Sequence, residues 1–99
     1  GLPMLETLDL HGNHLAIIDS GVFRDGMNRL NKLLLGDNQL AYIPYEELSP
    51  LRQLRYLDLS NNVIKQVLPA HELNGIRMSL DTLKLENNVI RMLWPGSFK

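Results

Sequence analysis

The stretch from Leu54 to Ile64, LRYLDLSNNVI, contains a spacing that recurs three more times in the chain. Written as L-x-x-L-x-L-x-x-N-x-L/I, it begins again at Leu5, Leu30 and Leu80, so successive starts lie 25, 24 and 26 residues apart. A period of this length is typical of an array in which each unit adds one strand and a return segment to a stack. The sequence therefore predicts a single array, residues 1–99, of four units.

Apolar and polar residues alternate in the centre of each unit. Leu57 and Leu59 are two residues apart and point to one side of an extended strand, whereas Tyr56 and Asp58 point to the other. The apolar side of one unit can be buried only against its neighbours. We therefore expect four parallel strands whose central leucines are adjacent in the sheet, namely Leu8, Leu33, Leu57 and Leu83.

An asparagine follows each strand, where the chain turns inward. The four residues are Asn13, Asn38, Asn62 and Asn88. Backbone groups in such a turn lose their partners in the sheet, and a carboxamide can both donate and accept hydrogen bonds. We predict a buried, structural asparagine ladder with no direct binding role.

The return segments have no room for a ten-residue helix. Two of them, residues 44–48 and 69–73, begin with proline, which suits the first position of a helical turn. We expect a single α or 3₁₀ turn there, and extended or 3₁₀ backbone elsewhere on the convex side. Large residues five apart, such as Ile18 and Phe23, are expected to close the core from this side.

With the return segment included, residues 30–51 read LNKLLLGDNQLAYIPYEELSPL. This pattern resembles the typical class of leucine-rich repeats, found mainly in extracellular adhesion molecules, Slit-like ligands, small proteoglycans and Toll-like receptors. Residues 5–23 and 54–75 are most similar to chaoptin-like insect cell-adhesion proteins. The resemblance implies an α/β leucine-rich repeat solenoid with a parallel β-sheet on the concave face, and an extracellular or cell-surface location.

The composition excludes several other classes of function. The formal net charge is -1 and there is no basic stripe, so nucleic acid is not an expected partner. No apolar run reaches about 18 residues, so we expect no membrane insertion by this segment. Repeat sequence continues to both ends, since Leu2 precedes Leu5 as Leu51 precedes Leu54. The sequence therefore predicts an uncapped fragment of a longer chain.

Neither catalysis nor metal binding is expected. His11 and Ser60 follow equivalent strands two units apart, about 10 Å from each other in a parallel sheet, whereas a nucleophile and its base need about 2.6–3.2 Å. Asp9, His11 and His14 have the side-chain types of metal ligands, but His14 comes after the turn, beside Asn13. We predict no enzyme activity, no metal and no cofactor.

The polar side of the predicted sheet is the candidate interaction surface. Leu34 interrupts its polar pattern diagonally from Tyr56, and an apolar and aromatic spot surrounded by charge has the composition of a binding hot spot. An exposed leucine is also ordinary on any protein surface. We predict a partner-binding concave face that consists of Leu34, Tyr56, Lys32, Asp58, Asp9 and Lys84.

The convex side offers a rival surface. Ile17, Tyr42 and Met92 occupy equivalent positions; they would form an exposed stripe for lateral pairing or, as we favour, pack partly under their own loops. The uncapped ends would also allow end-to-end self-association.

The sequence thus favours a non-catalytic protein-binding scaffold in an extracellular adhesion or ligand-recognition protein, with a homophilic partner among the candidates. Two alternatives remain open. One is the ectodomain of a Toll-like innate-immune receptor, and the other is an array that targets a catalytic domain elsewhere in the chain.

Overall fold

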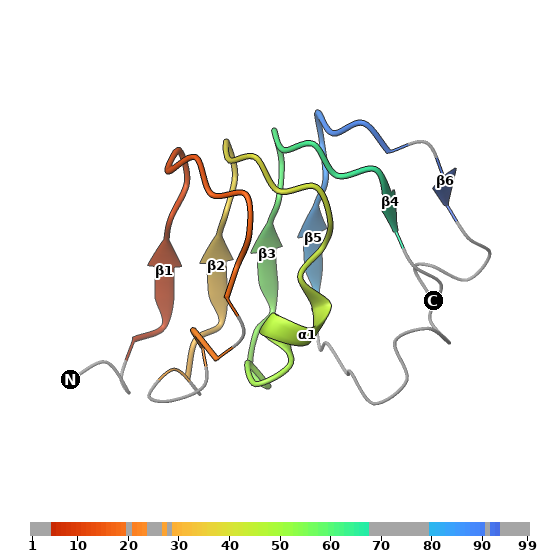
Figure 1. The fold of residues 1–99 in the computed structure, drawn as a ribbon. Coiled ribbons are helices and arrows are strands. Elements are labelled where there is room, and N and C mark those ends of the chain that lie inside the picture. Colours follow the sequence, from red (N-terminus) through yellow and green to blue (C-terminus); the bar gives the residue numbers. More distant parts are fainter. Residues whose placement is uncertain are drawn as a thin grey trace.

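The computed structural model describes residues 5–19, 21–23, 27, 29–67, 80–90 and 92–93. One strand from each repeat contributes to a four-stranded parallel sheet (Figure 1). The strands, in spatial order, are β1 (Thr7–Asp9), β2 (Lys32–Leu34), β3 (Tyr56–Asp58) and β5 (Thr82–Lys84).

The register of the sheet follows the repeat. Leu8 pairs with Leu33, Leu33 with Leu57, and Leu57 with Leu83. Backbone hydrogen bonds continue past the strand ends; for example, the Leu35 N–H donates to the Asp58 carbonyl at 2.8 Å. The expected alignment of the central leucines is therefore observed.

The core lies between this sheet and the return segments. Leu33 and Leu57 are fully buried, whereas Leu8 and Leu83 in the two outer strands are only partly buried. Ile18 and Phe23 are buried on the return side, as expected. Burial is greatest in the middle of the stack because a central unit has a neighbour on both sides.

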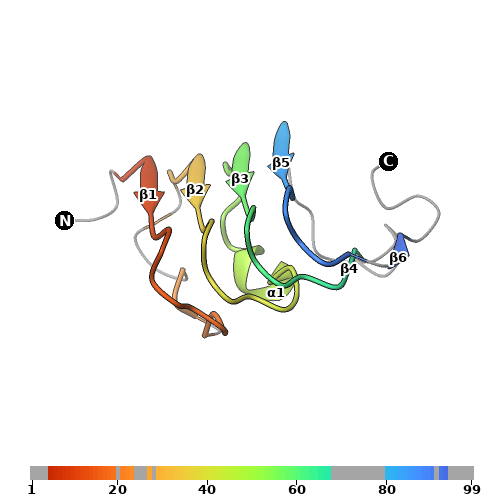
Figure 2. The same cartoon turned by 90° about the horizontal axis from the view of Figure 1, so that it is seen from above.

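The described parts of the return segments lie on the opposite side of the core from the sheet (Figure 2). One of them forms the single-turn helix α1 (Tyr45–Leu48), directly after Pro44. The Leu48 N–H donates to the Pro44 carbonyl at 3.0 Å, and the Leu48 side chain is buried in the core. The turn predicted at residues 44–48 is present, whereas the turn predicted at residues 69–73 lies outside the described residues.

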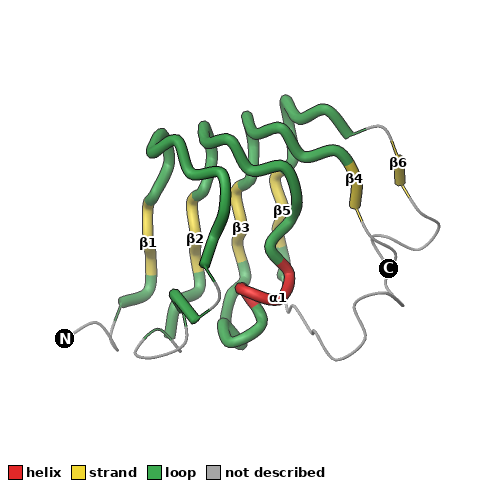
Figure 3. The backbone as a smooth tube through the Cα atoms, viewed as in Figure 1, coloured by secondary structure: helices red, strands yellow, loops and turns green. Residues whose placement is uncertain are grey.

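Two short strands on the return side were not foreseen. β4 (Gln66–Val67) and β6 (Met92–Leu93) pair in parallel, as a second sheet (Figure 3). The sequence predicted extended backbone there, but not its pairing. Units that stack in register bring equivalent extended segments within hydrogen-bonding distance. The predicted fold class, with a parallel sheet and short turn or extended return segments, is confirmed.

Our preferred prediction for the convex apolar residues, partial packing under their own loops, is wrong for Ile17, which is 66% exposed. Tyr42 is 41% exposed, so its side chain is partly covered. Each directly precedes a buried residue, Ile18 or Ile43, and neighbouring side chains of extended backbone point in opposite directions. The side chain of Met92 lies outside what the structure describes.

The residue before each ladder asparagine adopts a left-handed conformation. The φ angles are 70° at Gly12, 56° at Asp37, 57° at Asn61 and 59° at Asn87. Glycine, asparagine and aspartate are the residues that tolerate this conformation best. The residue types at these four positions are therefore a local signal for the turn geometry, and the predictions made from the sequence did not draw on it.

Candidate functional site

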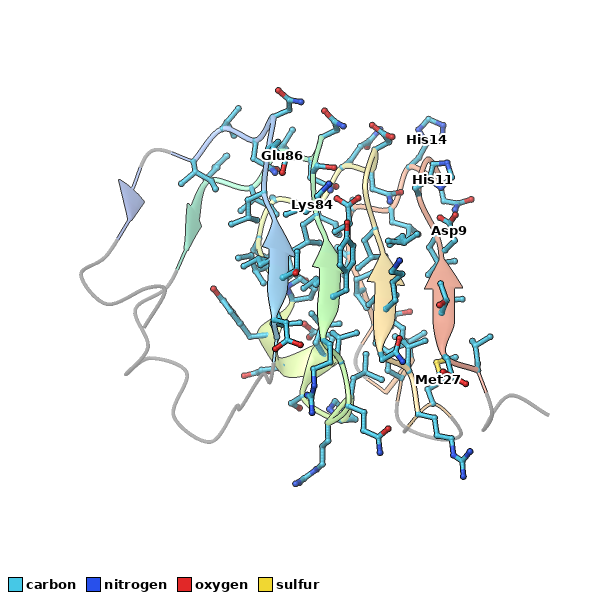
Figure 4. All side chains as sticks on the ribbon, turned by 180° about the vertical axis from the view of Figure 1, so that it is seen from behind. Asp9, His11, His14, Met27, Lys84 and Glu86 are labelled. Atoms are coloured by element: carbon cyan, nitrogen blue, oxygen red, sulfur yellow. The ribbon has the colours of Figure 1, made fainter. Side chains whose placement is uncertain are left out.

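The concave face is the side of the sheet that points away from the core. Strand alternation assigns three rows of side chains to it. The rows are Thr7, Lys32, Tyr56 and Thr82; Asp9, Leu34, Asp58 and Lys84; and His11, Gly36, Ser60 and Glu86. Figure 4 shows this face, with Asp9 and His11 from the first repeat and Lys84 and Glu86 from the last.

The six predicted partner-binding residues all belong to this face, but they differ in exposure. Lys32 and Asp9 are exposed, whereas Tyr56, Asp58, Lys84 and Leu34 are half-buried. Leu34 was expected to be exposed. It pairs with Asp9 on one side and Asp58 on the other, and these flanking residues reduce its access to water.

Tyr56 is the centre of the charged and aromatic part of the face. Lys32, its register partner on β2, places its Nζ 4.9 Å from the centroid of the Tyr56 ring, in a cation–π contact. On the other side, Lys84 lies on β5, diagonally across from Tyr56. The pKa of Lys84 is raised, first by the negative charge that Tyr56 acquires on ionisation and next by Glu86. The face therefore holds one aromatic ring between two ammonium groups.

Asp58 and Asp9 are each bonded by the residue two positions further along the chain. Asp58 Oδ1 accepts hydrogen bonds from Ser60 Oγ at 2.6 Å and from the Ser60 N–H at 2.9 Å. Asp9 Oδ1 has the same relation to His11, whose N–H donates at 3.1 Å and whose Nδ1 lies 2.5 Å away. Oδ1 of each of these two aspartates thus has two contacts, both with a single residue.

The Asp9–His11 pair also changes the acidity of both residues. The hydrogen bond to Asp9, followed by its negative charge, raises the pKa of His11. The same hydrogen bond lowers the pKa of Asp9. Asp37 and Asp58 contribute smaller effects that also raise the pKa of His11, so this end of the concave face stabilises positive charge.

Gly36 leaves a gap in the third row, between His11 and Ser60. A Cβ atom at this position would lie 3.3 Å from both the carbonyl oxygen and Oγ of Ser60, and 3.6 Å from Asp58 Oδ1. The absence of a side chain therefore gives the Asp58–Ser60 pair its space. No role was predicted for Gly36, and the repeat pattern alone holds no signal for one, because the close approach depends on two neighbouring strands.

The asparagine ladder bridges consecutive units. Asn62 donates from Nδ2 to Leu59 O at 3.0 Å in its own turn and to Leu35 O at 3.1 Å in the preceding unit, while its Oδ1 accepts from the Leu40 N–H at 2.9 Å. Asn38 and Asn88 make equivalent bonds. Each carboxamide therefore satisfies backbone groups of two units.

Asn13 differs from the other three asparagines. Its Nδ2 donates to Leu10 O at 2.8 Å and to His11 O at 3.2 Å, both in its own turn, and its side chain is exposed rather than buried. Burial was predicted for all four positions. It is observed at Asn38 and Asn62, which are 8% and 6% exposed and have a described unit on each side, and Asn88 is intermediate.

The candidate metal ligands do not converge. Asp9 and His11 contact each other, but His14 has a left-handed backbone after the turn. No group of three or more metal-binding side chains occurs among the residues that the structure describes. Within the same residues, no helix has the length and apolar character needed to cross a membrane.

Comparison with known proteins agrees with this geometry. Residues 2–64 match the family model described as Leucine rich repeat. The chain belongs to the leucine-rich repeat family. The leucine-rich repeat solenoid predicted from the spacing of its leucines and asparagines is therefore confirmed by both the sheet and the family match.

Several relatives share this leucine-rich repeat sequence. Vasorin from Xenopus tropicalis is 41% identical over 68 residues, 69% of this chain and 10% of vasorin. Tsukushi-A from Xenopus laevis is 36% identical over 92 residues, 92% of this chain and 25% of that protein. Transforming growth factor beta activator LRRC32 from Mus musculus is 36% identical over 94 residues, 93% of this chain and 13% of that protein.

This leucine-rich repeat segment spans between a tenth and a quarter of the length of these relatives. They are extracellular or cell-surface proteins, and the predicted extracellular or cell-surface location is confirmed. The family and these relatives are non-enzymatic proteins that take part in protein interactions. A specific similarity to chaoptin-like proteins is not among these findings.

Proposed function

We propose that this chain is a non-catalytic protein-binding segment of an extracellular or cell-surface protein and that it binds its partner on the concave face. The observation that carries the proposal is the position of Tyr56. Its ring lies between Lys32 and Lys84 and diagonally from half-buried Leu34, on the four-stranded sheet. Side chains held in place before binding lose little conformational entropy when a partner arrives.

The nature of the surface supports a protein partner. Tyrosine and an aliphatic residue surrounded by charge resemble the centre of a protein interface. One relative is named as an activator of transforming growth factor beta, so the family includes a protein that acts on another protein. For this chain, ligand recognition or adhesion through the concave face is the corresponding role, and a second copy of the chain is one candidate partner.

Three more specific functions are compatible with this proposal. Adhesion of the chaoptin-like type rests on the similarity of residues 5–23 and 54–75. A Toll-like receptor ectodomain or an array that targets an attached catalytic domain would use the same face. The absence of enzyme activity in this chain is proposed from the family and from the placement of His11 and Ser60 in repeats that are two strands apart in the sheet.

The test is an array of purified extracellular proteins, which includes this chain itself, probed with the wild-type chain. Leu34→Asp and Tyr56→Ala should each weaken binding to the captured protein by tenfold or more, since hot-spot residues cost about 2 kcal/mol or more on truncation. Far-ultraviolet circular dichroism should be unchanged. Lys65→Gln, at an exposed site on the return side, is the control and should bind as wild type.

A variant on the convex side can contradict the concave-face proposal. Ile17 is the most exposed large apolar residue in the described part of the chain. If Ile17→Ser abolished binding while Leu34→Asp and Tyr56→Ala had no effect, the interaction would belong to the convex side and the concave-face proposal would be wrong.

A further inference from the structure

The aspartates and the lysines of the concave face differ in the hydrogen-bond and ion-pair partners that they have within the chain. Asp58 is bonded twice by Ser60, and Asp9 forms an ion pair with His11. Among the residues that the structure describes, no salt bridge within 4.0 Å joins Lys32 or Lys84 to a carboxylate. Lys32 lies over the Tyr56 ring, and Lys84 lies diagonally across from Tyr56, two residues before Glu86. An ammonium group carries three donors, so both lysines retain capacity for an acceptor from outside.

The two lysines and the tyrosine are arranged on three neighbouring strands. Lys32 and Tyr56 are register partners on β2 and β3, and Lys84 on β5 lies diagonally beyond Tyr56. Adjacent strands are about 4.8 Å apart, so the site is about 10 Å wide, the size of one or two side chains. Leu34 follows Lys32 by two residues on the same side of β2 and provides an apolar contact next to the lysine.

We infer that this cluster binds an aspartate or glutamate side chain of the protein partner. The cluster consists of Lys32, Tyr56, Lys84 and Leu34. The carboxylate accepts hydrogen bonds from the two ammonium groups at the edge of the Tyr56 ring, and an apolar residue beside it packs on Leu34. This inference rests on the proposed protein-binding function and adds the chemistry that the partner presents.

The charge of the remaining face selects one carboxylate rather than a polyanion. Asp9 and Asp58 lie in the same row as Lys84, Glu86 lies in the next row, and the chain as a whole has a net charge of -1. A sulfated glycan or nucleic acid, with charges spread along its length, would meet these acidic residues. A partner cation is also disfavoured at Tyr56, because Lys32 already occupies its ring.

The experiment uses a phage-displayed library of random 12-residue peptides, selected on the immobilised 99-residue chain. Peptides that depend on the concave face are recognised by loss of binding to Leu34→Asp or Tyr56→Ala. These peptides should be enriched in Asp or Glu next to an aliphatic or aromatic residue. A synthetic copy should bind the Lys32→Gln, Lys84→Gln double variant about tenfold more weakly than wild type, because both charged contacts to the peptide carboxylate are lost.

Two controls refine the measurement. Lys65→Gln removes one lysine from another surface and should leave the peptide affinity unchanged. Replacement of the acidic residue of the peptide by Gln or Asn should reproduce the loss seen in the double variant, and added NaCl should reduce the affinity of the acidic peptide more than that of its amide version.

The outcomes separate this inference from the proposed function. Peptides that require Leu34 and Tyr56 but lack a carboxylate, or that bind the double variant as well as wild type, would overturn the inference and leave the concave-face function intact. Heparin is the test for a polyanion. If heparin bound more tightly than the selected peptides, and the Lys32→Gln, Lys84→Gln double variant no longer bound it, the inference would be overturned in favour of a polyanionic partner. Selected peptides that are all indifferent to Leu34→Asp and Tyr56→Ala would refute the concave-face function itself.

Discussion

Asn38 Oδ1 accepts a hydrogen bond from the backbone N–H of Leu15 at 2.9 Å, although the two residues are 23 positions apart in the chain. The same oxygen also accepts from the Asn13 N–H at 3.0 Å. A side chain of the second repeat thus completes the turn of the first. The repeats are linked at this point by polar bonds as well as by the packing of leucines.

The first prediction concerns the strength of this link. Asn62→Ala should lower the free energy of unfolding by about 1–3 kcal/mol, because the buried Leu40 N–H loses its acceptor and the carbonyls of Leu35 and Leu59 each lose one of two side-chain donors. Urea denaturation measures the change. Asn13→Ala is the control and should cost less, since Asn13 is exposed and its side chain bonds only carbonyls of its own turn. Equal losses at the two positions would contradict the bridging role.

The second prediction concerns the left-handed turn position at Asn61, where φ is 57°. Asn61→Val should destabilise the fold by about 1–2 kcal/mol, because a β-branched residue is strained at positive φ. Asn61→Gly should be nearly neutral, because glycine adopts this conformation freely. Thermal melts of the two variants provide the comparison, and a valine variant as stable as the glycine variant would argue against this turn geometry.

The third prediction concerns the burial of the central leucines, which is greater in the inner repeats than in the outer ones. Leu57→Ala should cost about 2–5 kcal/mol, because Leu57 is fully buried between Leu33 and Leu83. Leu83→Ala makes the same chemical change at an equivalent but only partly buried position and should cost less. Both are measured by equilibrium denaturation. A larger effect at Leu83 would mean that the order of burial is wrong.

The fourth prediction concerns pH and the Asp9–His11 pair. The pKa of His11 is higher in the folded chain than in the unfolded chain, where it is about 6.5. His11 therefore contributes its full stabilisation below about pH 6.5, and this contribution is lost as the pH rises through the pKa of the folded state. The pKa of Asp9 is lower in the folded chain than in the unfolded chain, where it is about 3.9. Its contribution to stability is therefore present above that pH and is lost as the pH falls through the pKa of the folded state. The pair therefore stabilises the fold most between these limits.

A nuclear magnetic resonance titration of the His11 ring tests this coupling. Asp9→Asn should lower the apparent pKa of His11, because it removes both the charge and the stronger acceptor. Asp37→Asn should lower it by a smaller amount, because Asp37 acts only through its charge. An unchanged titration in Asp9→Asn would show that the two side chains do not form this pair in solution.

The sequence by itself determined the repeat, the strand positions and the register. The spacing of Leu8, Leu33, Leu57 and Leu83 was sufficient, because a strand with one apolar side in each unit can be buried in only one way against an identical neighbour. The turn after Pro44 was equally local, since proline fixes its own φ angle. The left-handed turn positions were also determined locally, by the glycine, aspartate or asparagine that precedes each ladder asparagine.

Contacts between units were decided only by the tertiary structure. The space that Gly36 leaves for the Asp58–Ser60 pair, the second sheet of β4 and β6, and the placement of Lys32 and Lys84 on either side of Tyr56 all depend on atoms from different repeats. The exposure of Asn13 and the partial burial of Leu34 depend in the same way on which neighbours are present. Sequence period fixes the position of each residue within its own repeat, whereas distances across repeats fix what its side chain touches.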